Sequence, residues 1–433
     1  MIQTFCGIII ALLIFGFIVL IHEFGHFFVA KKFGVKIQEF SIGMGPRMFS
    51  KVSKEGIRYS IKLFPIGGSC SMMGEDEDNK KEGSFNSIAM WKRMVIVFAG
   101  PLANILLAFV LSIIIIGTKG IDLPYVTELK NSTNAYKAGL RIGDRIVDYR
   151  NAKIYVGRDL YFEEYIGLNA DDKIYLTFVR NQKKYNIQFS PNKVVQYKLG
   201  IIYNNSGKAT VTKVEKGSVA EKQGLKKNDV ICRVDNAQIS SGEELAEYFQ
   251  KHTILDERVK VIIQRGDKIK TIYLLPQKIT SYANGFEYNT VREKSSPNSL
   301  VKYAFMETRY AISYVVKSLK LIVRGRASLD DISGPVGIID TIGTTYKSSK
   351  SSGINSMFIS LLQISILLTA NLGIINLLPI PALDGGRIFI YIIQLITRRE
   401  INKDKEGIVH FVGFVLLMCL MILLVFNDIR KLV

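Results

Sequence analysis

"LIHEFGHFFVA" occupies residues 20–30, in the middle of an apolar run over residues 6–30. The run is long enough to cross the ~30 Å hydrocarbon core of a bilayer as a helix. It nevertheless contains His22, Glu23 and His26. Ionisable side chains are costly at membrane depth and usually have a function there. The stretch therefore predicts a transmembrane helix that carries a chemical site.

Three further apolar segments cover residues 94–117, 357–378 and 408–426. Each is long enough for one helical crossing. The predicted fold class is a polytopic α-helical membrane protein with about four transmembrane helices.

The distribution of basic residues predicts which side of the membrane each part occupies. The net charge is +19, and Lys31 and Lys32 follow the first span while Lys92 and Arg93 precede the second. By the positive-inside bias, residues 31–93 are cytoplasmic and residues 118–355 are extracytoplasmic. Arg430 and Lys431, at the outer end of the last span, run against this bias. The basic residues form no ladder with aromatic residues, so no nucleic-acid partner is expected.

The extracytoplasmic region contains an internal repeat. "AYKAGLRIGDRIVDYRNAKI" (135–154) aligns with "AEKQGLKKNDVICRVDNAQI" (220–239) at an offset of 85 residues, and Arg180 matches Arg265 at the same offset. This pattern predicts a tandem duplication of a domain of roughly 80 residues. Each copy resembles a PDZ domain, which commonly binds a peptide as an added strand on a sheet edge. The alternative is a pair of spacer domains.

Residues 299–326 have apolar and aromatic residues at helical spacing, interleaved with basic residues. The segment is too charged to span the membrane, so it predicts an amphipathic helix on the membrane surface, in contact with lipid. The alternative is a helix packed on the PDZ-like domains. The Ser-rich stretch 344–353 predicts a loop before the third span.

The chemistry of the first span follows from its spacing. Residues four apart project from one face of a helix, so His22 and His26 can direct two imidazoles at one metal ion. Glu23 is adjacent, and HExxH on a helix is the signature of zinc-dependent hydrolysis. The alternative is a structural His/Glu cluster between helices.

A catalytic zinc usually has three protein ligands, so a third must come from elsewhere in the chain. Asp384, in "NLGIINLLPIPALDGGR" (371–387), is the only acidic residue between Gly353 and Glu400. Two glycines follow it, and Pro379 and Pro381 precede it. Such irregular backbone is tolerated at membrane depth where it lines a cavity. The alternative is an ordinary turn at the membrane edge.

Three motifs around the PDZ-like repeats carry a resemblance over the whole chain: "HEFGH", "AGPLANILLA" and "NLLPIPALDGG". Together they resemble the site-2 protease family of intramembrane zinc metalloproteases, and most closely its bacterial branch called regulator of sigma-E protease. The resemblance implies that His22, His26 and Asp384 are zinc ligands and that Glu23 is the catalytic base.

The same resemblance extends to further elements. Asn376, Pro379 and Pro381 correspond to the family's substrate-positioning element, and Asn104 belongs to the motif of the second helix, where it also fits helix packing. Residues 39–68, within a β-hairpin region over 37–70, resemble membrane-associated hairpins on the cytoplasmic side. Met44 and the pair Ser69–Cys70 depart from the family's usual residues there.

The predicted organisation has five parts. Residues 1–118 form the first membrane half, 119–199 and 200–280 the two PDZ-like domains, 281–352 the surface helix and linker, and 353–433 the second membrane half.

The predicted function is a zinc-dependent endopeptidase in the bacterial cell (inner) membrane, with its active site towards the cytoplasmic face. It would cut transmembrane segments of protein or peptide substrates such as anti-sigma factors or remnant signal peptides. Two alternatives are a catalytically inert PDZ-bearing scaffold and a metal transporter. The transporter would be expected to have ligands on several spans and no peptide-binding repeats.

Overall fold

The computed structural model of the chain describes residues 2–75, 81–205, 207–251, 257–294, 296–325, 332–351, 353–399 and 401–432. Four of the described helices are long and apolar enough to cross a membrane: α1 (Ile2–Lys32), α2 (Met90–Lys119), α9 (Ile354–Asn376) and α11 (Lys403–Leu432). They correspond to the four predicted spans. The chain divides into a membrane unit (1–123, 155–159 and 290–433) and a second unit (124–154 and 160–289).

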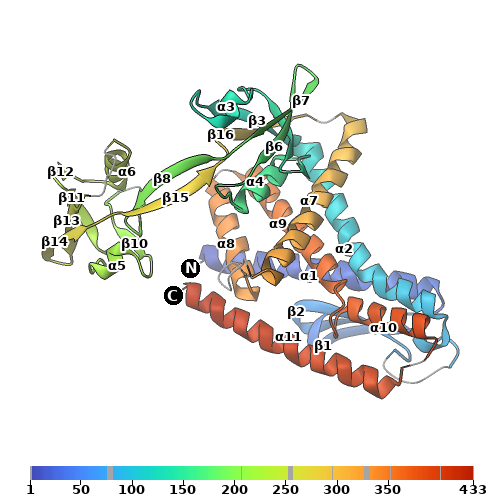
Figure 1. Cartoon of the computed structure of the whole chain (residues 1–433). Helices are drawn as coiled ribbons and strands as arrows, with labels where there is room; N and C mark the ends of the chain where they lie inside the picture. The colour runs from blue at the N-terminus through green and yellow to red at the C-terminus, as the bar shows by residue number, and fades with distance from the viewer. Residues whose placement is uncertain are drawn as a thin grey trace. The chain divides into compact units, whose positions relative to one another are not determined.

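Close helix packing places the first two sequence motifs against each other. In the membrane unit α1 contacts α2, and α2 contacts α9 (Figure 1). A Cβ atom added to Gly25 of α1 would lie 2.3 Å from the Ala99 carbonyl oxygen of α2. A Cβ atom at Gly373 of α9 would lie 3.0 Å from the Pro101 oxygen. Small residues of this kind let helix backbones approach closely in a membrane.

The helix α7 (Pro297–Val323) corrects the prediction for residues 299–326, of which residue 326 lies outside the described part. It contacts α2 and α9, whereas a surface helix or a helix packed on the PDZ-like domains was expected. Ala311 is fully buried, in a cluster with Ala108 of α2 and Ala370 of α9. Small residues on one face of α7 therefore permit helix–helix packing despite the basic residues on its other faces.

The helix α8 (Pro335–Ser351) corrects the prediction of a loop over 344–353. It contacts α1, and a Cβ atom added to Gly7 would lie 2.8 Å from the Gly343 Cα. The Asp428 carboxylate of α11 accepts hydrogen bonds from the N–H groups of Gly334 and Gly337, at 3.1 and 2.8 Å. These tertiary contacts stabilise a helix whose Ser and Thr residues alone favour a loop.

The predicted hairpin region contains two long strands, β1 (Ile37–Val52) and β2 (Arg58–Met72), which follow α1 in the chain. Residues 39–42 pair with 68–71 on one side and with 58–61 on the other. Strand β2 contacts α1, so this small sheet lies beside the helix that carries the HEFGH motif.

The second unit contains two sheets. The first has the strand order β16-β3-β4-β6-β7, and the second has the order β12-β11-β13-β14. A ribbon of β8 paired with β15 runs between the two repeats in sequence (Figure 1). The strands and helices of this region are β3 (Ile121–Leu129), α3 (Asn134–Lys137), β4 (Arg145–Tyr149), β5 (Ala152–Lys153), α4 (Gly157–Tyr165), β6 (Ile174–Arg180), β7 (Lys183–Phe189), β8 (Asn192–Lys198), β9 (Ile201–Tyr203), β10 (Val211–Val214), α5 (Val219–Lys222), β11 (Val230–Val234), β12 (Ala237–Gln238), α6 (Gly242–Lys251), β13 (Val259–Arg265), β14 (Lys268–Leu274), β15 (Gln277–Ala283) and β16 (Phe286–Glu293).

The boundaries predicted for the PDZ-like domains differ from the observed sheets. Strand β16 lies in the segment 281–352 that was predicted to follow both domains, yet it pairs with β3 of the first domain. Phe286 is buried in the core of the first domain together with Val126. The second repeat is therefore inserted into the first. A linear alignment of the repeats could not show this, because the returning strand is short.

The duplication is visible in a matched pair of buried ion pairs. Arg180 binds the Asp144 carboxylate with Nε at 2.7 Å, and Arg265 binds Asp229 with Nε at 2.6 Å. The offset of 85 residues relates both partners. Burial would raise the pKa of Asp229, but its hydrogen bonds from Arg265 outweigh burial and lower that pKa.

Candidate active site

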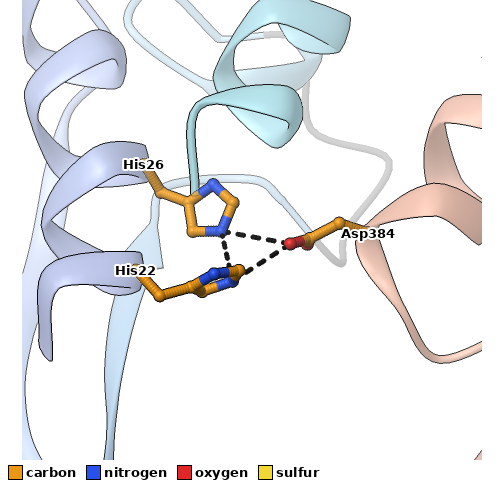
Figure 2. A group of neighbouring side chains, drawn as sticks. All are labelled: His22, His26 and Asp384. Carbon is orange, nitrogen blue, oxygen red and sulfur yellow. Dashed lines mark hydrogen bonds and ion pairs between the residues drawn. The ribbon is translucent and has the colours of Figure 1, made fainter. Parts of the chain in front are cut away.

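Three potential ligand atoms converge between α1 and the start of α10 (Asp384–Thr397), as Figure 2 shows. His22 Nε2 lies 3.1 Å from Asp384 Oδ2 and 3.2 Å from His26 Nε2. His26 Nε2 lies 3.5 Å from Asp384 Oδ2. Two ligands held about 2.0–2.1 Å from a tetrahedral zinc ion are ~3.3 Å apart. The three atoms thus already have the mutual spacing of a zinc ligand set.

The outer nitrogen atoms of the two histidines contact α2. His26 Nδ1 lies 2.9 Å from the Ile96 carbonyl oxygen, so it donates a hydrogen bond and leaves the Nε2 lone pair directed at the cluster. His22 Nδ1 lies 3.2 Å from the Asn104 side-chain amide. Asn104 Oδ1 is buried without a hydrogen-bond partner. Exchange of the amide oxygen and nitrogen, which differ little in shape, makes Oδ1 the acceptor for His22 Nδ1–H. Both histidines then present Nε2 lone pairs.

Asn104 therefore differs from its predicted role in substrate binding. The residue is fully buried, and its backbone oxygen accepts a hydrogen bond from Thr369 Oγ1 of α9 at 3.1 Å. It contacts His22 from the side opposite the cluster. We propose instead that Asn104 orients His22.

A glycine of α2 makes room for both imidazoles. A Cβ atom added to Gly100 would lie 2.2 Å from His26 Nε2 and 2.9 Å from His22 Cε1. Pro101 follows within the helix. The "AGP" part of the second motif is thus a surface against which the two rings rest.

Glu23 is held by the adjacent edge of β2. Its carboxylate accepts a hydrogen bond from the Cys70 backbone. A Cβ atom at Gly68 would lie 3.3 Å from Glu23 Cγ. The departure at Cys70 from the usual family residue therefore leaves this backbone contact intact, because the donor is the main chain.

Asp384 reaches the cluster from an irregular turn between α9 and α10. Ile380 N–H donates to the Leu378 oxygen at 2.7 Å, and Leu383 N–H donates to the Ile380 oxygen at 3.2 Å. A Cβ atom at Gly385 would lie 2.2 Å from the Leu378 oxygen. The glycine pair after Asp384 therefore lets the turn fold back against the first turn of α10.

A cavity of about 220 Å³ surrounds these groups. Its wall includes His22, Glu23, His26 and Asp384, so the structure brings all four predicted catalytic residues together. The wall also includes an ion pair between Arg387 and Glu75, two residues that the sequence argument did not select.

Asn376, Pro379 and Pro381 do not line this cavity in the described part of the chain. Asn376 is the last residue of α9. Pro381 instead lines an apolar groove along α11. These residues shape the turn before Asp384, and a direct contact with substrate remains a proposal for them.

The residues fit a zinc ion by two observations. The nitrogen and oxygen donors are those that zinc prefers. Asp384 Oδ2 is buried without a hydrogen bond of acceptable geometry, although two imidazoles lie beside it. A cation between the three atoms would satisfy that oxygen.

Sequence reasoning missed three supporting features: the space at Gly100, the Cys70 main-chain contact and the Arg387–Glu75 pair. The first could have been found from the small residues around it in "FAGPLA". The other two depend on tertiary contacts across long stretches of chain and have no local signal.

Comparison with known proteins places this site in a family. The model of peptidase family M50 matches residues 10–420. A relative from Clostridium acetobutylicum is 33% identical over 99% of this chain and 98% of its own length. The zinc metalloprotease RasP of Geobacillus kaustophilus is 27% identical over 100% of this chain and 99% of its own length. RasP of Oceanobacillus iheyensis is 28% identical over 97% of this chain and 98% of its own length.

Among solved structures, the PDZ domain of HtrA3 covers 21% of this chain at 15% identity. Its TM-score of 0.19 is too low to carry an argument about the fold. The family match, by contrast, extends over both membrane halves, and it excludes the predicted alternative of an inert scaffold. The chain therefore belongs to peptidase family M50, the site-2 protease family, and it is a zinc-dependent intramembrane endopeptidase.

Proposed function

We propose that His22, His26 and Asp384 bind the catalytic zinc and that Glu23 is the general base. The observation that carries this proposal is the convergence of three ligand atoms, 3.1–3.5 Å apart, in one cavity with Glu23.

The chemistry divides between the metal and the chain. Zinc, when bound, supplies a Lewis acid that lowers the pKa of a coordinated water and polarises the scissile carbonyl. Glu23 accepts the proton of the attacking water and returns it to the leaving nitrogen. The Cys70 main chain holds Glu23 in position for both transfers. His26 and His22 are oriented by the Ile96 carbonyl and by Asn104.

We place the site near the cytoplasmic face of a bacterial cell membrane. His26 lies only one turn and a residue before Lys31, which begins the basic end of α1. Lys92 and Arg93 at the start of α2, and Arg398 and Arg399 after α10, add to the same side.

The basic residues at the end of α11 do not oppose this orientation strongly. Arg430 donates to Asn427 Oδ1 at 3.0 Å, and Lys431 donates to the Ile332 oxygen at 2.9 Å. Contacts within the protein therefore satisfy both cations, which reduces their weight as topology signals.

The substrate is proposed to be a transmembrane segment that becomes extended before cleavage. Its amide groups are otherwise held in helical hydrogen bonds. In the described part of the chain, residues 68–72 pair only with 37–42, so the other edge of this strand is open for pairing. Gly68 and Cys70 also contact Glu23, which places that edge beside the base. Anti-sigma factors and remnant signal peptides are the substrate classes that we propose.

The zinc assignment is tested by metal content. Purified protein should contain about one zinc, in keeping with one three-ligand site. The variant His22→Ala/His26→Ala should lose it, as should Asp384→Ala. Full zinc occupancy in the double variant would exclude the assignment.

The base assignment is tested by Glu23→Gln. This variant should keep zinc, because Glu23 is not a ligand, and should cut a transmembrane substrate ~10²–10⁴-fold more slowly, because the amide cannot accept a proton. Glu55→Gln alters an exposed carboxylate that pairs with Lys31 and should cut normally. Near-normal cleavage by Glu23→Gln would require a different base.

A further inference from the structure

The fourth span carries a histidine that the proposed chemistry does not use. His410 lies in α11, and the chain has only four histidines, two of which are the proposed ligands. An ionisable residue within a membrane span is a candidate for function. Its Nδ1 accepts a hydrogen bond from the Ala382 N–H at 2.9 Å.

Ala382 has an unusual backbone conformation. Its φ is +74°, in the left-handed region that costs a non-glycine residue about 1–2 kcal/mol. Among the described non-glycine residues with positive φ, Ala382 alone has no polar side chain. A short polar side chain can stabilise that conformation locally, and alanine has none. The conformation must therefore be held by its surroundings.

A second residue of α11 contacts the same turn. A Cβ atom added to Gly413 would lie 2.5 Å from Pro381 Cβ and 2.6 Å from the Pro381 oxygen. Gly413 is three residues after His410, so both residues face the turn from one side of the helix. Gly413 is also one of the few buried residues of α11 in the described chain.

The turn controls the direction of a proposed metal ligand. Ala382 precedes Asp384 by two residues, and Asp384 is the first residue of α10. Leu383 between them is extended, with φ −103° and ψ 162°. A change at Ala382 therefore rotates the start of α10 and moves the Asp384 carboxylate relative to His22 and His26.

We propose that His410 is a positioning residue for Asp384, and that α11 supports the zinc site through His410 and Gly413. The inference rests on the proposed zinc assignment, because it concerns the orientation of the third ligand. His410 acts as an acceptor through Nδ1. Its loss leaves Ala382 free to leave the left-handed conformation, so Asp384 spends less time at the metal.

The test is zinc affinity, measured by competition with a chelator on purified full-length protein. His410→Ala removes the acceptor and should weaken zinc binding by about 10–100-fold, the usual effect of losing an outer partner of a metal ligand. His410→Asn places Oδ1 near the position of Nδ1 and should bind within about threefold of the wild type. Equal loss in both variants, or wild-type affinity in His410→Ala, would overturn the inference.

A paired substitution tests the physical cause. Ala382→Gly should bind zinc normally, because glycine adopts positive φ without steric cost. It should also restore part of the affinity lost in His410→Ala. If the double variant binds as weakly as His410→Ala, stabilisation of the turn is not the role of His410.

Gly413→Ala disturbs the same turn without altering His410. It should weaken zinc binding, whereas Gly407→Ala on the same helix should not, since no atom lies within 4 Å of the added Cβ. Identical affinities for these two variants would contradict a supporting role for α11.

Asp384→Ala separates the two hypotheses. If Asp384→Ala binds zinc as tightly as the wild type, the proposed ligand set is wrong. If Asp384→Ala loses affinity while His410→Ala does not, only the role of His410 is wrong.

Discussion

Gly100 shows how strictly a single residue position constrains the zinc site. Its missing side chain leaves space for His26 Nε2, which would lie 2.2 Å from an added Cβ. Gly100→Ala must therefore displace at least one imidazole. We expect zinc affinity to fall by at least ~10-fold, since fewer ligands remain in place.

The matched control lies in the same helix. Gly117→Ala adds the same methyl group, and its nearest neighbour is Leu300 Cδ1 at 3.8 Å, an ordinary contact. Zinc affinity measured by chelator competition should be unchanged in this variant. If Gly100→Ala also binds zinc normally, the two rings can move aside and the close contact has no functional weight.

The four catalytic residues were predictable because their chemistry is written in local patterns. His22 and His26 are four residues apart on a helix, and Asp384 is the lone acid in a long apolar stretch. The role of Asn104 was not predictable in the same way. Its position behind His22 depends on how α1 and α2 pack, and sequence motifs do not specify which face of α2 is turned inward.

At the scale of single elements, helix existence was easier to predict than helix environment. Hydropathy located all four spans, but it placed α7 at the membrane surface and left part of α8 as a loop. Both errors have the same origin. Ala311 in α7 and Gly343 in α8 make close contacts that compensate for poor local signals.

Strand β16 shows the corresponding difficulty for sheets. It was assigned to a linker because it lies beyond the second repeat, yet its partner β3 lies more than 150 residues earlier in the chain. Only the structure reveals such a long-range pairing, because the strand carries no turn signal that names its partner.

Contacts between α4 and the start of β16 make the stability of this domain depend on pH. Burial raises the pKa of Glu164 in α4 to about 7, despite hydrogen bonds from Tyr288 and Asn284. The folded state therefore holds this proton more tightly than the unfolded chain, whose value is about 4.5. The resulting stabilisation is full below pH 4.5 and is lost as the pH rises to about 7.

Glu164→Gln remains uncharged throughout that window and should remove this contribution, which is roughly 2–3 kcal/mol. Hydrogen exchange of α4 and β16 in the full-length protein should slow on acidification in the wild type and change less in the variant. Glu287→Gln alters an exposed carboxylate on β16 and should behave as the wild type. An unchanged pH response in Glu164→Gln would assign the effect to another group.

At the scale of the whole molecule, the proposed gating role of the PDZ-like domains is tested by their removal. The proposed zinc site lies near the basic end of α1, and a ~20-residue span places the opposite face ~30 Å away. The domains therefore cannot supply catalytic groups. They can exclude substrates that retain a large external domain.

A simple deletion of residues 124–289 would confuse this test. Residues 155–159 belong to the membrane unit, where Arg158 pairs with Glu307 and Asp159 lies 3.5 Å from Arg309. Burial lowers the pKa of Arg158 and raises that of Asp159, so both charges need these partners. The deletion would leave Glu307 buried and unpaired, at a cost of about 3–5 kcal/mol.

The informative variant combines the deletion with Glu307→Gln and Arg309→Gln. These two residues are two apart on α7 and cannot pair with each other, so both must be neutralised. We expect this variant to remain in the membrane, to bind one zinc ion and to cut a substrate that has no external domain. It should also cut the same substrate with its external domain intact, which the full-length enzyme rejects. Continued rejection by a zinc-loaded variant would place the selectivity in the membrane unit, because no other part of the enzyme would remain to impose it.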